Sequence, residues 1–116
     1  MPRGPNPSFM AGVPELMILR LLQNREMYGY QIVQAIRAET ADVVNLGEGI
    51  VYTVLHALER EGALKPRRKT VEGRSRIYYS VTASGLRRYR DLAETWTTLA
   101  ETIQSVMKGE RHVPAI

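Results

Sequence analysis

A heptad pattern of apolar residues toward the C-terminal end constrains the fold of this chain more than any other feature. The spacing alternates between three and four residues through Leu86, Tyr89, Ala93, Trp96, Ala100, Ile103 and Met107. This pattern predicts one helix from Ala83 to about Lys108, capped by Thr82. A helix of about 26 residues is roughly 39 Å long, which exceeds one small core. Packing within the chain is possible, but we expect association with a second copy.

The same stripe is widened by Leu92, Leu99 and Val106. A two-fold dimer would place the equivalent residues of both copies near one axis. The residues expected at this dimer interface are Leu86, Tyr89, Leu92, Trp96, Leu99, Ile103, Val106 and Met107.

Three shorter helices are predicted before the heptad. The first runs from Pro14, a residue favoured in the first helical turn, to about Asn24. The second opens at Tyr28-Gly29-Tyr30 and fades by Thr40, and the third runs from about Gly49 to a closing glycine at Gly62. The first is dense enough in apolar residues to be a buried helix, and the second and third each carry an apolar stripe on one face.

A β-hairpin is predicted between the third helix and the heptad. Its strands are Leu64–Val71 and Arg76–Val81, joined around Glu72 and Gly73. Alternation along the strands predicts that the hairpin is anchored to the helices by Val71, Ile77, Tyr79 and Val81. The side chains expected to face solvent are Lys69, Arg74 and Arg76.

This element order predicts a mainly α fold with a small β-hairpin, namely a winged helix-turn-helix followed by a long C-terminal dimerisation helix. Positions 65 to 76 hold six Lys or Arg residues against the single acid Glu72, and the chain carries a net charge of +4. A solubilising surface loop would also explain a charged hairpin tip. After a three-helix unit, however, the cationic ribbon favours binding to double-stranded DNA, because it can replace condensed counterions on the phosphates.

Other classes of function have little support in the sequence. Cysteine is absent, the two histidines are His56 and His112, and no metal-ligand spacing or nucleophile motif is present. We therefore expect no enzyme activity, no metal and no cofactor. No apolar run is long enough for a membrane span and no signal peptide is evident, so we expect a cytoplasmic, nucleoid-associated protein without a membrane partner.

The chain divides into four predicted regions. Residues 1–12, rich in Pro and Gly, form an N-terminal arm, and residues 13–82 form the winged helix-turn-helix. Residues 83–108 form the dimerisation helix, and residues 109–116 form a tail to which we assign no role.

Three segments resemble the PadR family of bacterial transcriptional regulators. They are "GVPELMILRLLQNREMYGYQIVQAI", "GEGIVYTVLHALEREGAL" and "EGRSRIYYSVTASGLRRYRDLAETW". The resemblance covers about Gly12 to Trp96 and implies a homodimeric winged-helix DNA binder. Such proteins are usually repressors that a small ligand or stress signal releases from a pseudo-palindromic operator. The short C-terminal helix is similar to the compact branch, some of whose members hold flat aromatic compounds at the dimer interface.

The resemblance also implies roles for individual residues in DNA binding. Tyr30 is expected near phosphate, and Tyr52 near the start of the recognition helix as a backbone contact. Ile50 stands where the family usually has Ser or Thr, so it either packs on a thymine methyl or turns inward. Thr53 and His56 are expected to contact bases. Lys69, Arg74 and Arg76 are expected to contact DNA from the hairpin, which forms the wing of the winged helix.

Trp96 is the only tryptophan and has two compatible interpretations. It can be an apolar anchor between two helices, or it can stack on a planar aromatic effector. The small neighbours Ala93 and Ala100 leave room beside the indole, which favours a ligand site. Two alternatives to a regulator remain: a winged-helix protein-interaction module and a nonspecific architectural DNA binder.

Overall fold

A computed structural model of the chain describes residues 12–109. In chain order its elements are α1 (Val13–Leu22), α2 (Gly29–Glu39), α3 (Glu48–Arg60), β1 (Leu64–Val71), β2 (Arg74–Val81) and α4 (Ala83–Lys108). The predicted arm before Gly12, the tail beyond Gly109 and His112 lie outside the described residues. Within the described range the predicted fold class is confirmed, with four helices, one two-stranded antiparallel sheet and a long last helix.

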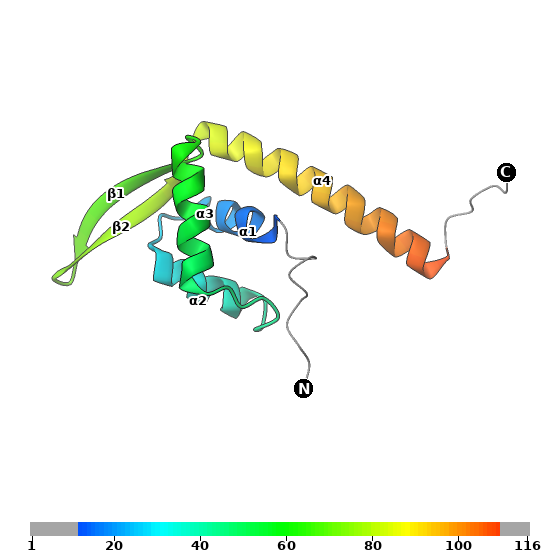
Figure 1. Ribbon diagram of the computed structural model, residues 1–116, viewed down its shortest axis with the longest axis horizontal. Coiled ribbons are helices and arrows are strands. Elements are labelled where there is room, and N and C mark those ends of the chain that lie inside the picture. The colour runs from blue at the N-terminus through cyan, green and yellow to red at the C-terminus, as the bar shows by residue number, and fades with distance from the viewer. Residues whose placement is uncertain (1–11, 110–116) are drawn as a thin grey trace.

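The core lies where α1, α2 and α3 meet, and the hairpin and the far end of α4 project from it in opposite directions (Figure 1). Its largest fully buried side chains are Ile18, Leu19, Ile32, Ile36, Val51, Leu55 and Leu58. These residues recur at helical spacing on one face of each helix, which is why three short amphipathic helices are stable together.

The helix ends follow local chemistry. Pro14 lies in the first turn of α1, where its missing N–H costs no helical hydrogen bond. The backbone N–H of Tyr28 donates to the Gln31 side chain, at 3.2 Å, and so satisfies a donor at the start of α2. Gly62, with a φ of 79°, takes the left-handed conformation that follows α3. Helix α1 ends at Leu22, two residues before the predicted Asn24.

The hairpin turns through only two residues. Glu72 and Gly73 both have positive φ, at 52° and 78°, as in the tight turn that matches the twist of paired strands. Val71 therefore pairs directly with Arg74. This pairing starts β2 at Arg74, two residues earlier than the sequence predicted.

Both faces of the hairpin are buried at its base. Tyr79 is buried in the hydrophobic core, as expected, and Tyr78 is buried on the opposite face against the ring of Tyr28. Val71 shares the face of Tyr78 because its register partner is Arg74, and it is 36% exposed. The prediction that Val71 anchors the hairpin is wrong, since it lies on the opposite face from Ile77, Tyr79 and Val81.

Met27 adds a short third segment to the free edge of β2. Its backbone exchanges two hydrogen bonds with that of Tyr79, at 3.2 and 2.9 Å. The polar backbone groups of Tyr79 thus point away from β1, so its β1 partner Pro66 lies at a position where a strand needs no N–H donor. This explains how an eight-residue strand contains a proline.

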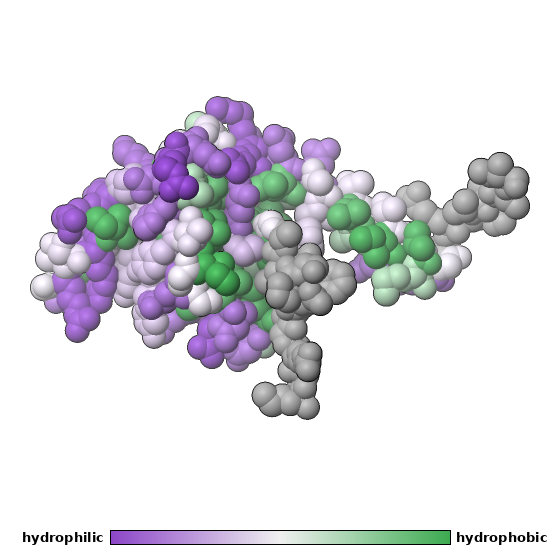
Figure 2. Space-filling view, in the orientation of Figure 1, coloured by the Kyte–Doolittle hydropathy of each residue, from purple (hydrophilic) through white to green (hydrophobic). Residues whose placement is uncertain are grey.

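Helix α4 begins as predicted at Ala83, after the Thr82 hydroxyl accepts a hydrogen bond from the Gly85 N–H at 3.1 Å. Its N-terminal part is tied to the core: Arg88 forms ion pairs with Glu15 of α1 and with Glu61 after α3. Its C-terminal half extends beyond the three-helix core and exposes apolar side chains, which are green in Figure 2.

Candidate nucleic-acid interface

An open groove of about 570 Å³ lies between the hairpin, the start of α2 and the exposed side of α3. It is lined by Tyr28, Tyr30, Tyr52, His56, Arg74, Arg76, Ile77 and Tyr79. Five of the residues predicted to contact DNA therefore lie together, although they come from three separate elements. The groove combines phenol hydroxyls, an imidazole and two guanidinium groups, which are all donors suited to phosphate oxygens or base edges.

Tyr52 is positioned by a glycine. A Cβ atom added to Gly29 would overlap the Tyr52 ring, with the hydroxyl oxygen at 2.6 Å. The tyrosine ring thus lies directly on the α2 backbone while the side chain stays 38% exposed. The sequence showed Gly29 between two tyrosines, but it contained no signal that Tyr52, twenty-three residues later, packs on it.

The exposed face of α3 carries one apolar side chain in its first turn. Ile50 is 51% exposed, so the alternative in which it turns inward is excluded. The Thr53 hydroxyl donates to the Gly49 carbonyl at 2.8 Å, which commits its proton to the helix backbone. Ile50 and Thr53 lie one helical turn apart on this face, where they can meet a base edge.

Two wing cations lie over aromatic rings. The Arg76 guanidinium is 4.4 Å from the centroid of the Tyr28 ring, and that ring packs edge-on against Tyr78 at 5.3 Å. The Lys69 ammonium is 4.9 Å from the Tyr78 ring. Cation–π contacts of this kind reduce the freedom of long side chains without neutralising their charge. Arg76 is therefore held at the edge of the groove with its charge available.

Glu26, in the connection between α1 and α2, was not expected to take part in the wing. Its carboxylate accepts hydrogen bonds from Arg67 Nη2 at 2.5 Å, Arg67 Nε at 3.2 Å and Lys69 Nζ at 2.9 Å. The hydrogen bonds from Arg67 and then from Lys69 lower the pKa of Glu26 to about 2. The partners are 41 and 43 residues away in the sequence, so no local pattern could have indicated this cluster.

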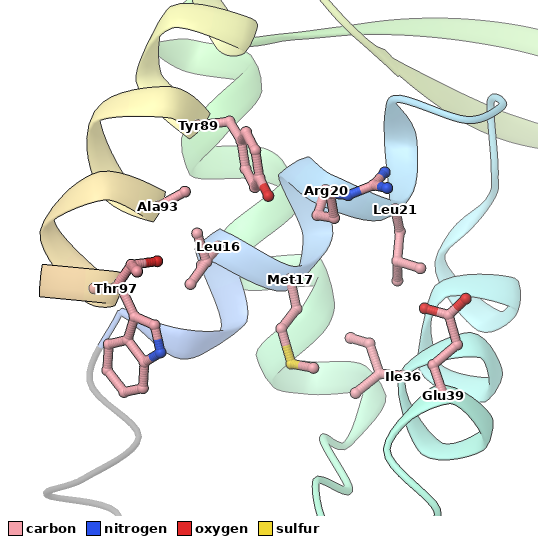
Figure 3. A pocket seen from close by; sticks show the side chains of 10 residues that line it. Leu16, Met17, Arg20, Leu21, Ile36, Glu39, Tyr89, Ala93 and Thr97 are labelled. Carbon is pink, nitrogen blue, oxygen red and sulfur yellow. The ribbon is translucent and has the colours of Figure 1, made fainter. Parts of the chain in front are cut away.

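A second, smaller site lies between α1, α2 and α4. This pocket of about 280 Å³ is lined by Leu16, Met17, Arg20, Leu21, Ile36, Glu39, Tyr89, Ala93, Trp96 and Thr97 (Figure 3). Trp96 and Ala93, both predicted ligand residues, share this pocket, whereas Ala100 lies with Trp96 in a neighbouring hollow of about 230 Å³. Trp96 is 44% exposed and borders both spaces.

The predicted dimerisation residues divide into two groups along α4. Tyr89 and Leu92 are partly buried against the core of their own chain, and Leu86 is also partly buried. The remaining members are exposed large side chains, namely Trp96, Leu99, Ile103, Val106 and Met107. The first part of α4 therefore packs against its own chain, and the last part leaves its apolar side chains exposed.

Over residues 12–109, no cluster of His, Asp or Glu has a geometry suited to a metal ion. In the same part of the chain, no helix is both long enough and apolar enough to cross a membrane.

Comparison with known proteins identifies the family. The model of the "Transcriptional regulator PadR-like family" matches residues 18–91, which include α2, α3 and the whole hairpin. The chain belongs to the PadR-like family. PadR-like proteins are transcriptional regulators rather than enzymes, and membership implies that this chain binds DNA.

Three individual proteins are similar to this chain over most of its length. The transcriptional regulator Rv3488 of Mycobacterium tuberculosis is 29% identical over 104 residues, which cover 90% of this chain and 92% of that protein. A transcriptional regulator structure from Clostridium thermocellum is 28% identical with a TM-score of 0.78, covering 84% of this chain and 96% of that one. A structure from Streptococcus mutans is 27% identical with a TM-score of 0.81, and the match covers 98% of this chain and 100% of that one.

Proposed function

We propose that this PadR-like regulator is a homodimeric repressor that binds a pseudo-palindromic operator. The observation that carries the proposal is the groove in which α2, α3 and the wing bring Tyr30, Tyr52, His56, Arg74 and Arg76 together. Helix α3 lies in the major groove of the DNA, and the wing follows the adjacent backbone. The same proposal places the protein on the nucleoid in the cytoplasm.

The proposed interface residues have two roles: some position the protein on the DNA backbone, and others read the base sequence. Tyr30, Tyr52, Arg74 and Arg76 contact phosphates, for which hydroxyl and guanidinium donors are suited. Lys69 adds to the positive field of the wing. Base edges are read from α3 by Thr53, His56 and Ile50, with the isoleucine packed on a thymine methyl.

Dimerisation in this proposal uses the outer half of α4. Leu99, Ile103, Val106 and Met107 are exposed on a helix that extends beyond its own core, as a coiled-coil or bundle surface would be. A two-fold axis along this surface sets two copies of α3 about 34 Å apart, one turn of B-DNA. The operator half-sites then face the same side of the duplex.

A planar aromatic effector is proposed to bind beside Trp96, with Ala93 and Ala100 leaving space for it. Binding changes the angle between the α4 helices and hence the spacing of the α3 helices, provided that the ligand prefers one dimer geometry. Flat aromatic compounds should quench the fluorescence of Trp96, the only tryptophan, and weaken operator binding together. Quenching with unchanged operator affinity would contradict the coupling.

Salt titration of binding to duplex DNA tests the regulator proposal. A sequence-specific reader should show a steep fall of log K with log salt and a preferred sequence. Replacing Arg74 and Arg76 with alanine should flatten the slope by about 1–2 units, at roughly 0.9 per lost phosphate contact. No binding at low salt would favour a protein-interaction module, and a slope without sequence preference would favour an architectural DNA binder.

A further inference from the structure

The cations of the wing fall into two groups with different surroundings. Arg67 and Lys69 on β1 share the carboxylate of Glu26. Arg74 and Arg76 on β2 border the DNA-binding groove, and neither forms an ion pair within residues 12–109. The wing therefore presents fewer free charges than its sequence suggests.

Backbone pairing holds Glu26 in place beside β1 and β2. The next residue, Met27, exchanges two backbone hydrogen bonds with Tyr79 of β2. Arg67 and Lys69 are two residues apart on β1, so their side chains leave the same face of the hairpin. The carboxylate, whose side chain is only 24% exposed, thus meets both cations at the base of the wing with little freedom to move away.

The contacts themselves occupy the groups that would bind a phosphate. Arg67 uses two N–H donors on both carboxylate oxygens, the fork geometry that a phosphate also requires. Lys69 donates to one of the same oxygens. One carboxylate lowers the charge of this trio from +2 to +1. With a pKa of about 2, Glu26 is ionised throughout the neutral pH range.

We propose that Glu26 is an internal counterion of the wing that withholds Arg67 and Lys69 from DNA and so limits non-specific binding. The inference rests on the proposed DNA-binding function. Affinity for DNA of arbitrary sequence comes almost entirely from phosphate neutralisation. Each wing cation that is kept from the backbone therefore lowers affinity about equally for random duplex and for operator. Glu26 is thus a positioning residue that sets how strongly the wing is held by phosphates, whatever the DNA sequence.

Replacing Glu26 with glutamine tests the proposal, because glutamine keeps the size of the side chain and removes its charge. In salt titrations the slope of log K against log salt should steepen by about 1–2 units, at roughly 0.9 per new phosphate contact. Affinity should rise by a similar factor for random duplex and for the operator, so their ratio should stay about the same. A purely structural role would change the unfolding midpoint and leave the salt slope as it was.

Two alanine pairs serve as matched controls in the otherwise unchanged chain. Arg67→Ala with Lys69→Ala should change the slope by less than about half a unit, whereas Arg74→Ala with Arg76→Ala should lose about 1–2 units. If both pairs lost the same amount, Arg67 and Lys69 would be ordinary phosphate contacts and the inference would be overturned. This comparison decides the matter even if the Glu26→Gln variant does not fold.

The outcomes also separate this inference from the proposed function. If the unmodified protein bound no DNA at low salt, the proposed function itself would fail. A second outcome would overturn only the role of Glu26. In that case the unmodified protein binds DNA and the salt slope falls as expected for Arg74→Ala with Arg76→Ala, but the slope of Glu26→Gln is unchanged.

Discussion

At the scale of single residues, the interface depends on side chains whose neighbours restrict them. Tyr52 rests on Gly29, Arg76 lies over Tyr28, and Thr53 commits its proton to the Gly49 carbonyl. Ile50 differs from them because it is a large apolar side chain left half exposed on the outer face of α3. Its position suggests base contact by a methyl group rather than by a hydrogen bond.

The contact of Ile50 with thymine predicts sensitivity to a single methyl group. Replacing the contacted thymine with uracil removes only that methyl and should weaken operator binding by about 0.8 kcal/mol, roughly fourfold. The Ile50→Ala variant should bind more weakly and should no longer distinguish thymine from uracil. Operator titrations with uracil at each thymine in turn give the measurement. Equal losses for both proteins would rule out this contact.

Gly29→Ala should be destabilising, even though alanine normally favours a helix by about 0.5–1 kcal/mol over glycine. The added methyl meets the Tyr52 ring, so the ring must move and the operator contact should be lost with it. Urea unfolding and operator titration measure the two effects. In a Tyr52→Ala background the same change should become neutral or stabilising, because the obstructing ring is gone. Persistence of the destabilisation there would show that another neighbour causes it.

At the scale of elements, the base of the wing packs against the rest of the domain, whereas its tip is exposed. Met27 pairs with β2, Tyr28 covers Tyr78, and Glu26 holds two cations of β1. Toward the Glu72–Gly73 turn, the paired residues Val71 and Arg74 are both exposed. This arrangement lets the tip of the hairpin adjust to a DNA backbone while its base keeps a constant angle to α3.

The ion pairs of Glu26 predict a pH-dependent contribution to the stability of the wing. Its pKa falls from 4.5 to about 2 on folding, because Arg67 and Lys69 stabilise the ionised form. A lowered folded pKa contributes stability above the unfolded value, and this contribution is lost as pH falls from about 4.5 through 2. The wild-type protein should thus exceed Glu26→Gln in unfolding free energy at pH 6, lose most of that advantage by pH 2.5 and lose the rest below pH 2. A difference that stays constant across this range would contradict the assignment.

At the scale of the whole molecule, α4 has two different environments along one continuous apolar stripe. Its first turns are part of the domain core, through Tyr89, Leu92 and the Arg88 ion pairs. Its last turns expose Leu99, Ile103, Val106 and Met107 to solvent in the single chain. An apolar surface of this kind on a monomer is a typical site of association.

Leu99→Glu with Ile103→Glu should convert the proposed dimer into a folded monomer. The two side chains are half exposed, so the charges do not enter the core, but they would oppose each other across a two-fold axis. Sedimentation equilibrium should give the mass of one chain with unchanged helical circular dichroism, and operator affinity should fall because two half-sites are no longer bound together. Arg74→Ala with Arg76→Ala is the matched control and should remain dimeric. A dimer that survives the glutamate changes would place the interface elsewhere.

Much of the fold follows from local patterns, and the candidate site follows in part. The apolar spacing predicted all four helices, and α4 has the expected bounds because a heptad of that length permits no other element. Alternation and the Glu-Gly turn predicted the hairpin, apart from the start of β2 and the face of Val71, since these depend on the register that the turn sets. The groove was anticipated through Tyr30, Tyr52, His56, Arg74 and Arg76, whose roles as DNA contacts stay predictions.

By itself the sequence determined which segments are helical, which form the ribbon, and that the ribbon is cationic. Periodicity and charge are local properties, and they report how each segment presents its faces. Only the tertiary structure decided that Glu26 meets Arg67 and Lys69, that Tyr52 rests on Gly29 and that α4 is half core and half free surface. These contacts join residues far apart in the chain, and the packing of the three-helix core, rather than any local preference, brings them together.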